Sequence, residues 1–429
     1  MTYKETLDFL YSQLPAYHRI GKAAYKSNLD NTTKLDEYFG HPHQKYMTIH
    51  IAGTNGKGSV SHMIASVLQQ AGYRTGLYTS PHLKDFRERI KINGEMITEQ
   101  DVISFAEENS GIIGEVKPSF FEMSVAMAFN YFARKTVDIA VIEVGLGGRL
   151  DSTNIISPVV SVITNIGHDH MDLLGDTLEK VAGEKAGIIK RGVPVVIGET
   201  KPETKEVFLS YAGNSGSEIY FADQNYACEL GEMNPGETGR NFTIHELKGI
   251  SCTSGIIPLN GDYQEANLIT LFQLFRCIEK RLNLTEQNLT DGISNVIINT
   301  GLLGRWQVIG KSPLIVCDTA HNQEGLESVL KQIKEIPATK LHIVFGFVSD
   351  KSLDSILPLF PVDAEYYFTK AAVPRALNEN KLMTEASRFG LRGKSYITVN
   401  EALKAARKSS VPTDLIFVGG STFVVAEVI

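Results

Sequence analysis

The chain has 429 residues, of which 43% are hydrophobic and 21% charged, and its formal net charge is −7 at pH 7. A single core stops growing near ~250–300 residues, so we expect two domains. No stretch is strongly basic, which argues against a nucleic-acid partner. The four scattered cysteines form no C-x-x-C pair, and we find neither a signal peptide nor an apolar segment of membrane-spanning length. We therefore expect a cytoplasmic protein with no membrane partner.

The first part of the chain leads into a glycine-rich loop. The segment to about Gln44 predicts a helix and an irregular stretch, and Tyr46–Ala52 predicts a short apolar strand. Ser59–Ala71 has apolar residues at helical spacing, and Gly72 ends it. Backbone N–H groups in a glycine loop and the N-terminus of the next helix both attract phosphate. The loop between this strand and this helix is Gly53-Thr54-Asn55-Gly56-Lys57-Gly58-Ser59.

Lys57 would give this loop a mobile positive charge for the β- and γ-phosphates of a nucleotide. The general P-loop pattern places Ser or Thr directly after the lysine, whereas Gly58 comes before Ser59 here. A simple tight turn is the alternative interpretation. The strand before the loop and the helix after it favour the phosphate site.

Strands and helices then alternate, which predicts a sheet of parallel strands. Residues 201–257 break this alternation, and we expect a small β-rich section there. The predicted strands are Thr75–Thr79, Asp138–Val144, Val159–Ile163 and Pro194–Ile197. The predicted helices are Phe120–Ala133, Thr177–Ile189, Gln264–Arg281 and Glu286–Val296, with a further helix start at Thr98.

A second α/β pattern begins near Leu314. Its predicted strands are Leu314–Cys317, Leu341–Phe345, Glu365–Thr369 and Leu415–Val418. The predicted fold is thus α/β, with a P-loop-type, mostly parallel sheet domain over residues 1–297. A hinge linker at 298–305 containing Gly301 and Gly304 would precede a smaller doubly wound, Rossmann-like domain over 306–429.

Polar side chains follow the predicted strands at the edge where α/β proteins bind ligands. Glu143 could hold Mg²⁺ or cap the next loop. His168, Asp169, His170 and Asp172 follow the next strand, and the residue types alone do not choose among them. Both groups of residues are also compatible with hydrogen-bonded loop positions.

Further candidates lie in a helix and at the start of the second domain. Lys185 lies among apolar neighbours, where a lysine is most often solvated. Arg305, Asp318 and His321 open the second domain, and Asp318 directly follows a strand, where an acidic group often meets a ribose or a metal.

Taken together, these segments resemble the folylpolyglutamate synthase and dihydrofolate synthase family, a branch of the Mur ligase superfamily. The order and spacing of the matching strings span nearly the whole chain. They are Gly-Thr-Asn-Gly-Lys-Gly-Ser at 53–59, Tyr-Thr-Ser-Pro-His-Leu at 78–83, Phe-Arg-Glu-Arg-Ile at 86–90, Phe-Phe-Glu-Met at 120–123, Ile-Glu-Val-Gly-Leu-Gly-Gly-Arg-Leu-Asp-Ser-Thr-Asn at 142–154, Asp-His at 169–170, Glu-Lys-Ala-Gly-Ile at 184–188, Gly-Arg at 304–305, Asp-Thr-Ala-His-Asn at 318–322 and Ser-Asp-Lys at 349–351.

The resemblance implies that ATP binds between the domains, with its triphosphate on Gly53, Thr54, Asn55, Gly56, Lys57, Gly58 and Ser59. It assigns Mg²⁺ to Ser80, Glu143 and His170. Lys185 matches a lysine that the family carbamylates, so its carbamate would hold a second Mg²⁺. ATP and two Mg²⁺ ions are therefore expected, with K⁺ as a further candidate cation.

The resemblance also assigns the remaining site residues. Asn267 matches a residue beside the adenine, Arg305 lies near the phosphates, and Asp318 and His321 lie near the nucleotide. Lys57, Lys185, Arg305 and His321 are the expected catalytic positions. Thr319 and the pair Trp306-Gln307 depart from commoner family forms without removing a reacting group. The folate-side positions are Pro81, His82, Phe121, Glu122 and Asp151.

The implied reaction joins the amino group of L-glutamate to a folate-side carboxylate through an acyl phosphate. The first reading is a monomeric, bifunctional enzyme that uses dihydropteroate and then reduced folates such as tetrahydrofolate. Alternatives are a folylpolyglutamate synthase only, another amide ligase of the superfamily, and a non-enzymatic P-loop nucleotide switch. The short segment ahead of the glycine loop argues against a cell-wall substrate, and the second domain argues against the switch.

Overall fold

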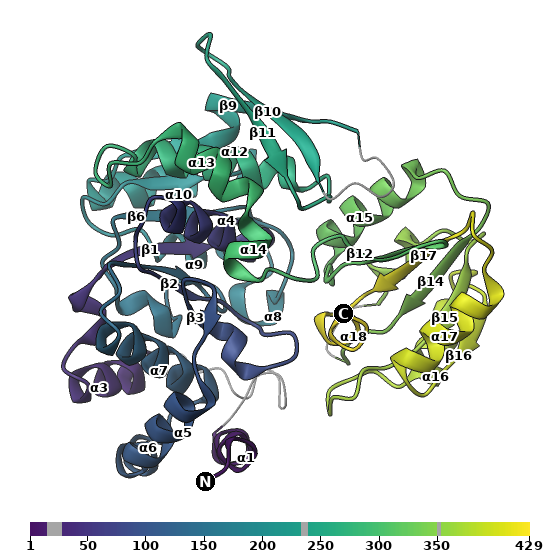
Figure 1. The fold of residues 1–429 in the computed structure, drawn as a ribbon, viewed down its shortest axis with the longest axis horizontal. Helices are drawn as coiled ribbons and strands as arrows, with labels where there is room; N and C mark the ends of the chain where they lie inside the picture. Colours follow the sequence, from purple (N-terminus) through teal and green to yellow (C-terminus); the bar gives the residue numbers. More distant parts are fainter. Residues whose placement is uncertain (15–27, 233–238, 350–352) are drawn as a thin grey trace. The chain divides into compact units, whose positions relative to one another are not determined.

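The computed structural model describes residues 1–14, 28–232, 239–349 and 353–429, which form two compact units (Figure 1). Unit 1 comprises Met1–Gly231, Asn241–Pro258 and Gln264–Gly301, and unit 2 comprises Glu232–Arg240, Leu259–Tyr263 and Leu302–Ile429. Within the described residues, no helix is long and apolar enough to cross a membrane. The functional boundaries at 297 and 305 stay a prediction.

Unit 1 is built around an eight-stranded sheet in the order β4-β3-β2-β5-β1-β6-β7-β8. From β2 to β8 all neighbouring strands are parallel, whereas β3 and β4 extend the sheet as antiparallel strands. The predicted, mostly parallel sheet is therefore confirmed. The strands are β1 (Met47–Ala52), β2 (Thr75–Tyr78), β3 (Ile90–Ile92), β4 (Glu95–Met96), β5 (Ile139–Glu143), β6 (Val160–Ile163), β7 (Val195–Ile197) and β8 (Ile219–Phe221).

Helices pack on this sheet, as Figure 1 shows. Helix α4 (Lys57–Gln70) lies against β2 and β5 and contacts α12 (Gln264–Ile278), α13 (Glu286–Ser294) and α14 (Val296–Thr300). The alternate residues Ala140 and Ile142 of β5 belong to a core with α7 (Phe120–Arg134). The remaining helical segments are α1 (Tyr3–Gln13), α3 (Asp30–Tyr38), η2 (Pro42–Lys45), η3 (Phe86–Arg89), α5 (Glu99–Glu108), α6 (Ser110–Val116), η4 (Ser152–Ile155), α8 (Met171–Leu174), α9 (Leu178–Ala186), α10 (Pro202–Ser215) and α11 (Ala222–Asn225).

The expectation of a β-rich section over residues 201–257 is wrong for its first part. Helix α10 has Pro202 in its first turn and buries Phe208 and Ala212, which are one helical turn apart. Strand β8 then joins the main sheet. The described residues farther along do form a separate three-stranded sheet, in which β10 (Arg240–Glu246) lies between β9 (Tyr226–Leu230), its antiparallel neighbour, and β11 (Cys252–Ile257).

Unit 2 has a six-stranded sheet in the order β12-β13-β17-β14-β15-β16. All neighbouring strands are parallel except β12, which pairs antiparallel with β13. The two edge strands were not predicted, whereas the four central ones were. The elements are β12 (Gln307–Lys311), β13 (Leu314–Cys317), α15 (Gln323–Glu335), β14 (Leu341–Phe345), η5 (Leu357–Leu359), β15 (Glu365–Phe368), α16 (Glu379–Ser387), β16 (Gly393–Ser395), α17 (Val399–Ser409), β17 (Leu415–Gly419) and α18 (Thr422–Ala426).

Candidate functional site

The glycine loop is held against the segment after β6 by backbone and side-chain hydrogen bonds. The N–H of Thr54 donates to the carbonyl of Asn165 over 3.0 Å, and the N–H of Asn55 donates to the Asn165 side-chain oxygen over 2.8 Å. The hydroxyl of Thr164 donates to the carbonyl of Asn55 over 2.5 Å. A Cβ on Gly53, which has φ +147°, would lie 1.9 Å from that hydroxyl oxygen. Glycine is therefore required for the loop to approach β6.

Helix α12 supports the other side of the loop. Gly56, with φ +85°, precedes the first turn of α4, and a Cβ there would lie 2.2 Å from the side-chain oxygen of Asn267. Asn267 is buried and donates to Gln264 over 2.8 Å, and Gln264 donates to the hydroxyl of Ser59 over 3.4 Å. The predicted adenine-side residue Asn267 therefore packs directly against the loop.

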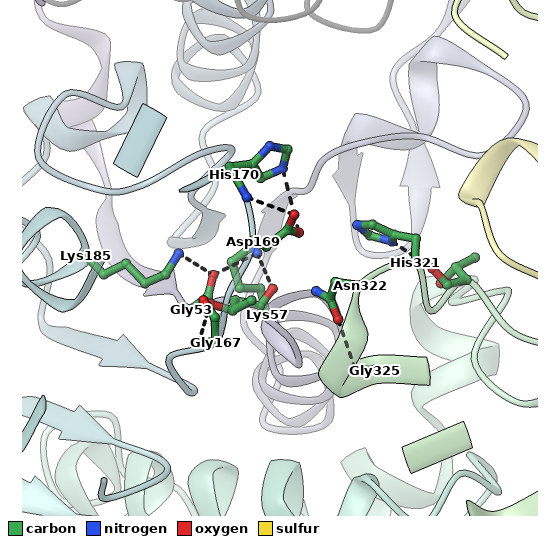
Figure 2. Close-up of polar contacts among 11 residues, drawn as sticks. Gly53, Lys57, Gly167, Asp169, His170, Lys185, His321, Asn322 and Gly325 are labelled. Carbon is green, nitrogen blue, oxygen red and sulfur yellow. Dashed lines mark hydrogen bonds and ion pairs between the residues drawn. The ribbon is translucent and has the colours of Figure 1, made fainter. Parts of the chain in front are cut away.

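Two lysine side chains converge on one carbonyl of the loop. Lys57 Nζ donates to the carbonyl oxygen of Gly53 over 2.9 Å and to that of Thr54 over 3.0 Å. Lys185 Nζ also donates to the carbonyl of Gly53 over 2.9 Å. Figure 2 shows the two amines directed at Gly53 from α4 and α9. A lysine on α9 that sequence reasoning would leave solvated thus lies beside the predicted phosphate loop.

The pKa of Lys185 lies near neutral pH, far below the usual value for a lysine. Its side chain is buried, and burial together with the nearby charge of Lys57 lowers the pKa of Lys185 to about 7. The carboxylates of Asp169 and Asp151 oppose this shift. Only an uncharged amine attacks carbon dioxide, so this environment suits the formation of a carbamate.

Glu143 and Ser80 meet at the carboxyl ends of β5 and β2. Glu143 is buried, and its Oε2 accepts from the backbone N–H of Ser80 over 3.3 Å. Across the described residues, no group of three or more His, Cys, Asp or Glu side chains could hold a metal ion alone. Mg²⁺ needs few protein ligands when phosphate and water complete its coordination, so a carboxylate beside a serine fits this ion.

The segment after β6 places His170 next to Asp169. The N–H of His170 donates to Asp169 Oδ1 over 2.9 Å, and His170 Nε2 lies 3.8 Å from Asp169 Oδ2 (Figure 2). His170 has φ +54° and precedes α8. The hydroxyl of Thr54 donates to the carbonyl of Gly167 over 3.3 Å, which joins this segment to the glycine loop.

The predicted folate-side residues occupy two neighbouring segments of unit 1. Exposed Pro81 precedes His82, whose Nδ1 accepts from the Nε of buried Arg89 over 2.8 Å. The Arg89 guanidinium lies 5.4 Å from the ring centre of Phe120, the first residue of α7. Arg89 lies in the matched string at 86–90, but the sequence analysis assigned it no role.

The other folate-side predictions have clear structural contacts. The ring of Phe121 packs so closely on Gly145 that a Cβ added to this glycine would lie 2.4 Å from it. Glu122 completes the capping box of α7 and also accepts from Asn31 over 3.3 Å. Asp151 is buried, caps the N-terminus of η4 and accepts from the N–H of Leu146 over 2.8 Å. Burial raises the pKa of Asp151, and its hydrogen bonds oppose that shift.

Unit 2 carries a separate polar cluster at the end of β13. Asp318 is buried, and its Oδ2 accepts from the hydroxyl of Tyr263 over 2.6 Å and from the N–H of Trp306 over 2.7 Å. Its Oδ1 accepts from the N–H of Ala320 over 2.8 Å. Burial raises the pKa of Asp318, and the Tyr263 hydrogen bond and the Arg305 charge oppose this.

Arg305 and His321 lie on the two turns that meet at Asp318. The Arg305 guanidinium donates to the hydroxyl of Thr319, whose N–H donates to the carbonyl of Gly304 over 3.1 Å. The ring Nδ1 of His321 lies 2.9 Å from the carbonyl oxygen of Thr319. Asn322 caps α15 by accepting from the N–H of Gly325 over 2.9 Å (Figure 2). In the 349–351 string, Asp350 and Lys351 lie outside the described residues.

Comparison with protein families gives the class to which this fold belongs. Residues 51–273 match the Mur ligase middle domain, and residues 304–422 match the glutamate ligase domain of Mur ligases. These ranges include the glycine loop, the first part of α12 and the Asp318 turn. The fold is thus that of a Mur-type ligase, with a middle domain followed by a glutamate ligase domain.

Individual relatives narrow this class. The folylpolyglutamate synthase of Lacticaseibacillus casei is 33% identical over 441 residues, covering 100% of this chain and 98% of the relative. The dihydrofolate synthase/folylpolyglutamate synthase of Bacillus subtilis is 31% identical, with 95% of each chain covered. The solved structure of Escherichia coli FolC in complex with DHPP and ADP matches with a TM-score of 0.86, at 27% identity, over 100% of this chain and 97% of that one. The chain belongs to the folylpolyglutamate synthase/dihydrofolate synthase family of Mur ligases.

Proposed function

We propose that this chain is an ATP-dependent, ADP-forming ligase that joins L-glutamate to 7,8-dihydropteroate and also to tetrahydrofolate. The observation that carries the proposal is the glycine loop with two lysines converging on Gly53, because an anionic carboxylate must approach an anionic triphosphate there. Relatives named for both activities support the bifunctional form. A folylpolyglutamate synthase only, as the Lacticaseibacillus casei relative is named, is the second candidate.

The reaction would have two steps. The carboxylate of the pteroate or folate attacks the γ-phosphorus of ATP, which forms an acyl phosphate and releases ADP. The amino group of glutamate then attacks the acyl carbon, loses a proton and displaces inorganic phosphate. Lys57 and Arg305 would offset the charge that builds up on the phosphoryl group during the first step. His321 and Asp318 would help to hold the nucleotide.

Glu143, Ser80 and His170 are the proposed Mg²⁺ ligands, and Lys185 as its carbamate is the proposed ligand of a second Mg²⁺. Bound Mg²⁺ supplies positive charge to the phosphate oxygens. K⁺ is a further candidate cation. The low pKa of Lys185, about 7, supports the carbamate because a fraction of the molecules carry this lysine as an uncharged amine at neutral pH. Partial rescue of Lys185→Ala by small carboxylates such as formate would agree with this assignment, and full unrescued activity would contradict it.

A direct test offers the purified protein ATP, Mg²⁺ and glutamate with either dihydropteroate or tetrahydrofolate, and follows ADP release. We expect release with each folate substrate, and none when glutamate and folate are both left out. Release with tetrahydrofolate alone would select the second candidate, and release with neither would overturn the proposal. We further propose that the protein is cytoplasmic and monomeric. Gel filtration with light scattering would test the monomeric state.

A further inference from the structure

A short segment of unit 2 interrupts unit 1. Residues Leu259–Tyr263 belong to unit 2, although the chain before and after them belongs to unit 1. The N–H of Asp262 donates to the side-chain oxygen of Gln332 over 2.9 Å, and the Gln332 amide donates to the carbonyl of Asn260 over 2.8 Å. Gln332 is buried on α15, so both ends of its amide are used to hold this segment.

The last residue of this segment, Tyr263, reaches the centre of the Asp318 cluster. Its hydroxyl donates to Asp318 Oδ2 over 2.6 Å. Burial raises the pKa of Tyr263 well above its usual value, and the nearby Asp318 charge raises it further. The phenol therefore keeps its proton and remains a donor across the physiological pH range. A buried carboxylate depends strongly on each of its donors, because water does not replace a lost one.

Asp318 also holds the two backbone turns that carry Arg305 and His321, the residues proposed to bind the nucleotide. It accepts from the N–H of Trp306, which directly follows Arg305, and from the N–H of Ala320, which directly precedes His321. Trp306 has φ +43°, an uncommon conformation for a bulky residue, so this turn depends on its hydrogen bonds. A displaced Asp318 carboxylate would shift both turns.

The residue after Tyr263 serves the glycine loop. Gln264 begins α12 and donates to the hydroxyl of Ser59 over 3.4 Å, and it also accepts from Asn267. Consecutive residues of the chain, Tyr263 and Gln264, therefore hydrogen-bond to polar groups of the two units.

We propose that Tyr263 is a positioning residue for nucleotide binding, whose hydroxyl acts through Asp318 to set the turns that carry Arg305 and His321. This inference rests on the proposed function, in which those residues hold ATP. It assigns Tyr263 no contact with the substrate. Its role is to keep the Asp318 carboxylate in place.

The experiment compares Tyr263→Phe with the unchanged protein by ATP titration calorimetry and by steady-state kinetics. We expect the Kd and the KM for ATP to rise about tenfold, the loss of one hydrogen bond to a charged group. The kcat should fall less than threefold and the KM for glutamate should stay within twofold. A Kd for ATP within twofold of the original value, in a folded variant, would overturn the proposal.

A matched control removes a tyrosine hydroxyl elsewhere in unit 2. Tyr366 is buried and donates to the carbonyl of Pro361 in the core of this unit. Tyr366→Phe should lower thermal stability without changing the Kd for ATP. An equal rise in Kd for the two variants would mean that general loosening of unit 2 is the cause, and would refute a specific role of Tyr263.

Two further variants separate the possible failures. When Asp318 is already replaced by Asn, adding Tyr263→Phe should raise the Kd for ATP less than twofold further. If Tyr263→Phe raised the Kd as much in this background as in the unchanged protein, action through Asp318 would be contradicted. Gln332→Leu removes the two hydrogen bonds that hold the segment and leaves the Tyr263 hydroxyl in place. It should raise the Kd for ATP about threefold. This variant keeps the proposal testable if Tyr263→Phe does not fold. Absence of folate-dependent ADP release by the unchanged protein would defeat the proposed reaction alone, because the calorimetry would still test Tyr263.

Discussion

Lys57 and Lys185 place two cationic groups around one carbonyl oxygen, that of Gly53. Burial lowers the pKa of Lys185, and repulsion by the nearby positive charge of Lys57 lowers it further. The partly exposed Lys57 is thus the charge that can meet a phosphate, while Lys185 is available for other chemistry. Their different exposure gives the two residues different roles.

Replacement of Lys57 should affect chemistry far more than folding. We expect Lys57→Ala to lower the rate of ADP formation by about 100- to 1,000-fold, the range seen when one preorganised charge or donor is removed. The thermal midpoint should change little because Lys57 is only partly buried. Lys45→Ala, which removes an exposed lysine near β1, is the matched control and should leave the rate unchanged. Near-normal turnover of Lys57→Ala would refute the phosphate role.

Lys185 predicts a particular pH dependence of stability. Its pKa is about 7 in the folded chain and about 10.5 when unfolded. Between these values the unfolded chain binds the extra proton, so the contribution of Lys185 to stability rises with pH, by up to roughly 1.4 kcal/mol per pH unit. Below pH 7 both states are protonated and the penalty is constant.

The measurement compares the unchanged protein with Lys185→Met by urea unfolding from pH 7 to pH 10 in bicarbonate-free buffer. We expect the advantage of the methionine variant to be largest at pH 7 and to shrink steadily toward pH 10. A stability difference that does not vary with pH would show that the folded-state pKa of Lys185 is not lowered.

At the scale of elements, α4 has a glycine with positive φ near each end, but the surroundings differ. Gly56 has φ +85° and Gly72 has φ +87°. A Cβ at Gly56 would meet Asn267 at 2.2 Å, whereas nothing lies within 4 Å of a Cβ at Gly72. The two sites therefore share the same backbone strain and differ in whether α12 is in the way.

This pair gives a controlled prediction. Gly72→Ala should cost about 1–2 kcal/mol for the left-handed conformation and leave the KM for ATP unchanged. Gly56→Ala should cost more, because Asn267 must move, and should raise the KM for ATP at least about tenfold, since a small misplacement can cost 100-fold. Urea unfolding and steady-state kinetics would measure both effects. Equal effects of the two substitutions on KM would contradict the role of the α12 contact.

The elements that could be predicted from the sequence are those with strong local signals. The central strands are continuous apolar runs, and the glycine loop lies between a strand and a helix. The edge strands β12 and β16 carry few apolar residues, so they gave no such signal. Helix α10 was obscured by the Gly- and Pro-containing stretch that follows it.

The candidate site shows the same limit at longer range. Strand ends predicted Glu143 and Asp318, but a local pattern cannot reveal a partner far away in sequence. Tyr263 and Asp318 are 55 residues apart, and Lys185 lies 132 residues from Gly53. The resemblance to a family suggested Lys185, whereas Tyr263 became apparent only from the three-dimensional contacts.

At the scale of the whole molecule, the division into units does not follow a single cut in the chain. Unit 2 includes Leu259–Tyr263 as well as the continuous part from Leu302 to Ile429. A fragment that begins at Leu302 would leave Asp318 without its phenol donor and Gln332 without both of its backbone partners. The sheet of unit 2 would still be complete, from β12 to β16.

We therefore expect the fragment 302–429 to fold but to unfold at a lower temperature than unit 2 in the full chain. Three missing hydrogen bonds of about 1 kcal/mol each would lower the stability of a small domain noticeably. Calorimetry of the fragment and of the full chain would measure the difference. Addition of a synthetic peptide covering 259–263 in excess should raise the midpoint of the fragment, and no change with the peptide would contradict the contribution of this segment.

The interrupted course of the chain also matters while the protein is being made. The ribosome delivers Leu259–Tyr263 before it delivers Asp318 and Gln332, the residues that hold this segment. Because chains generally fold from the N-terminal side as they emerge, unit 1 can assemble first with this segment still lacking its partners. The last step of biogenesis is then the binding of this earlier-made segment by the rest of unit 2, which is synthesised later. A released chain that ends at Gly301 should accordingly be cleaved by protease at 259–263, and the full chain should resist cleavage there.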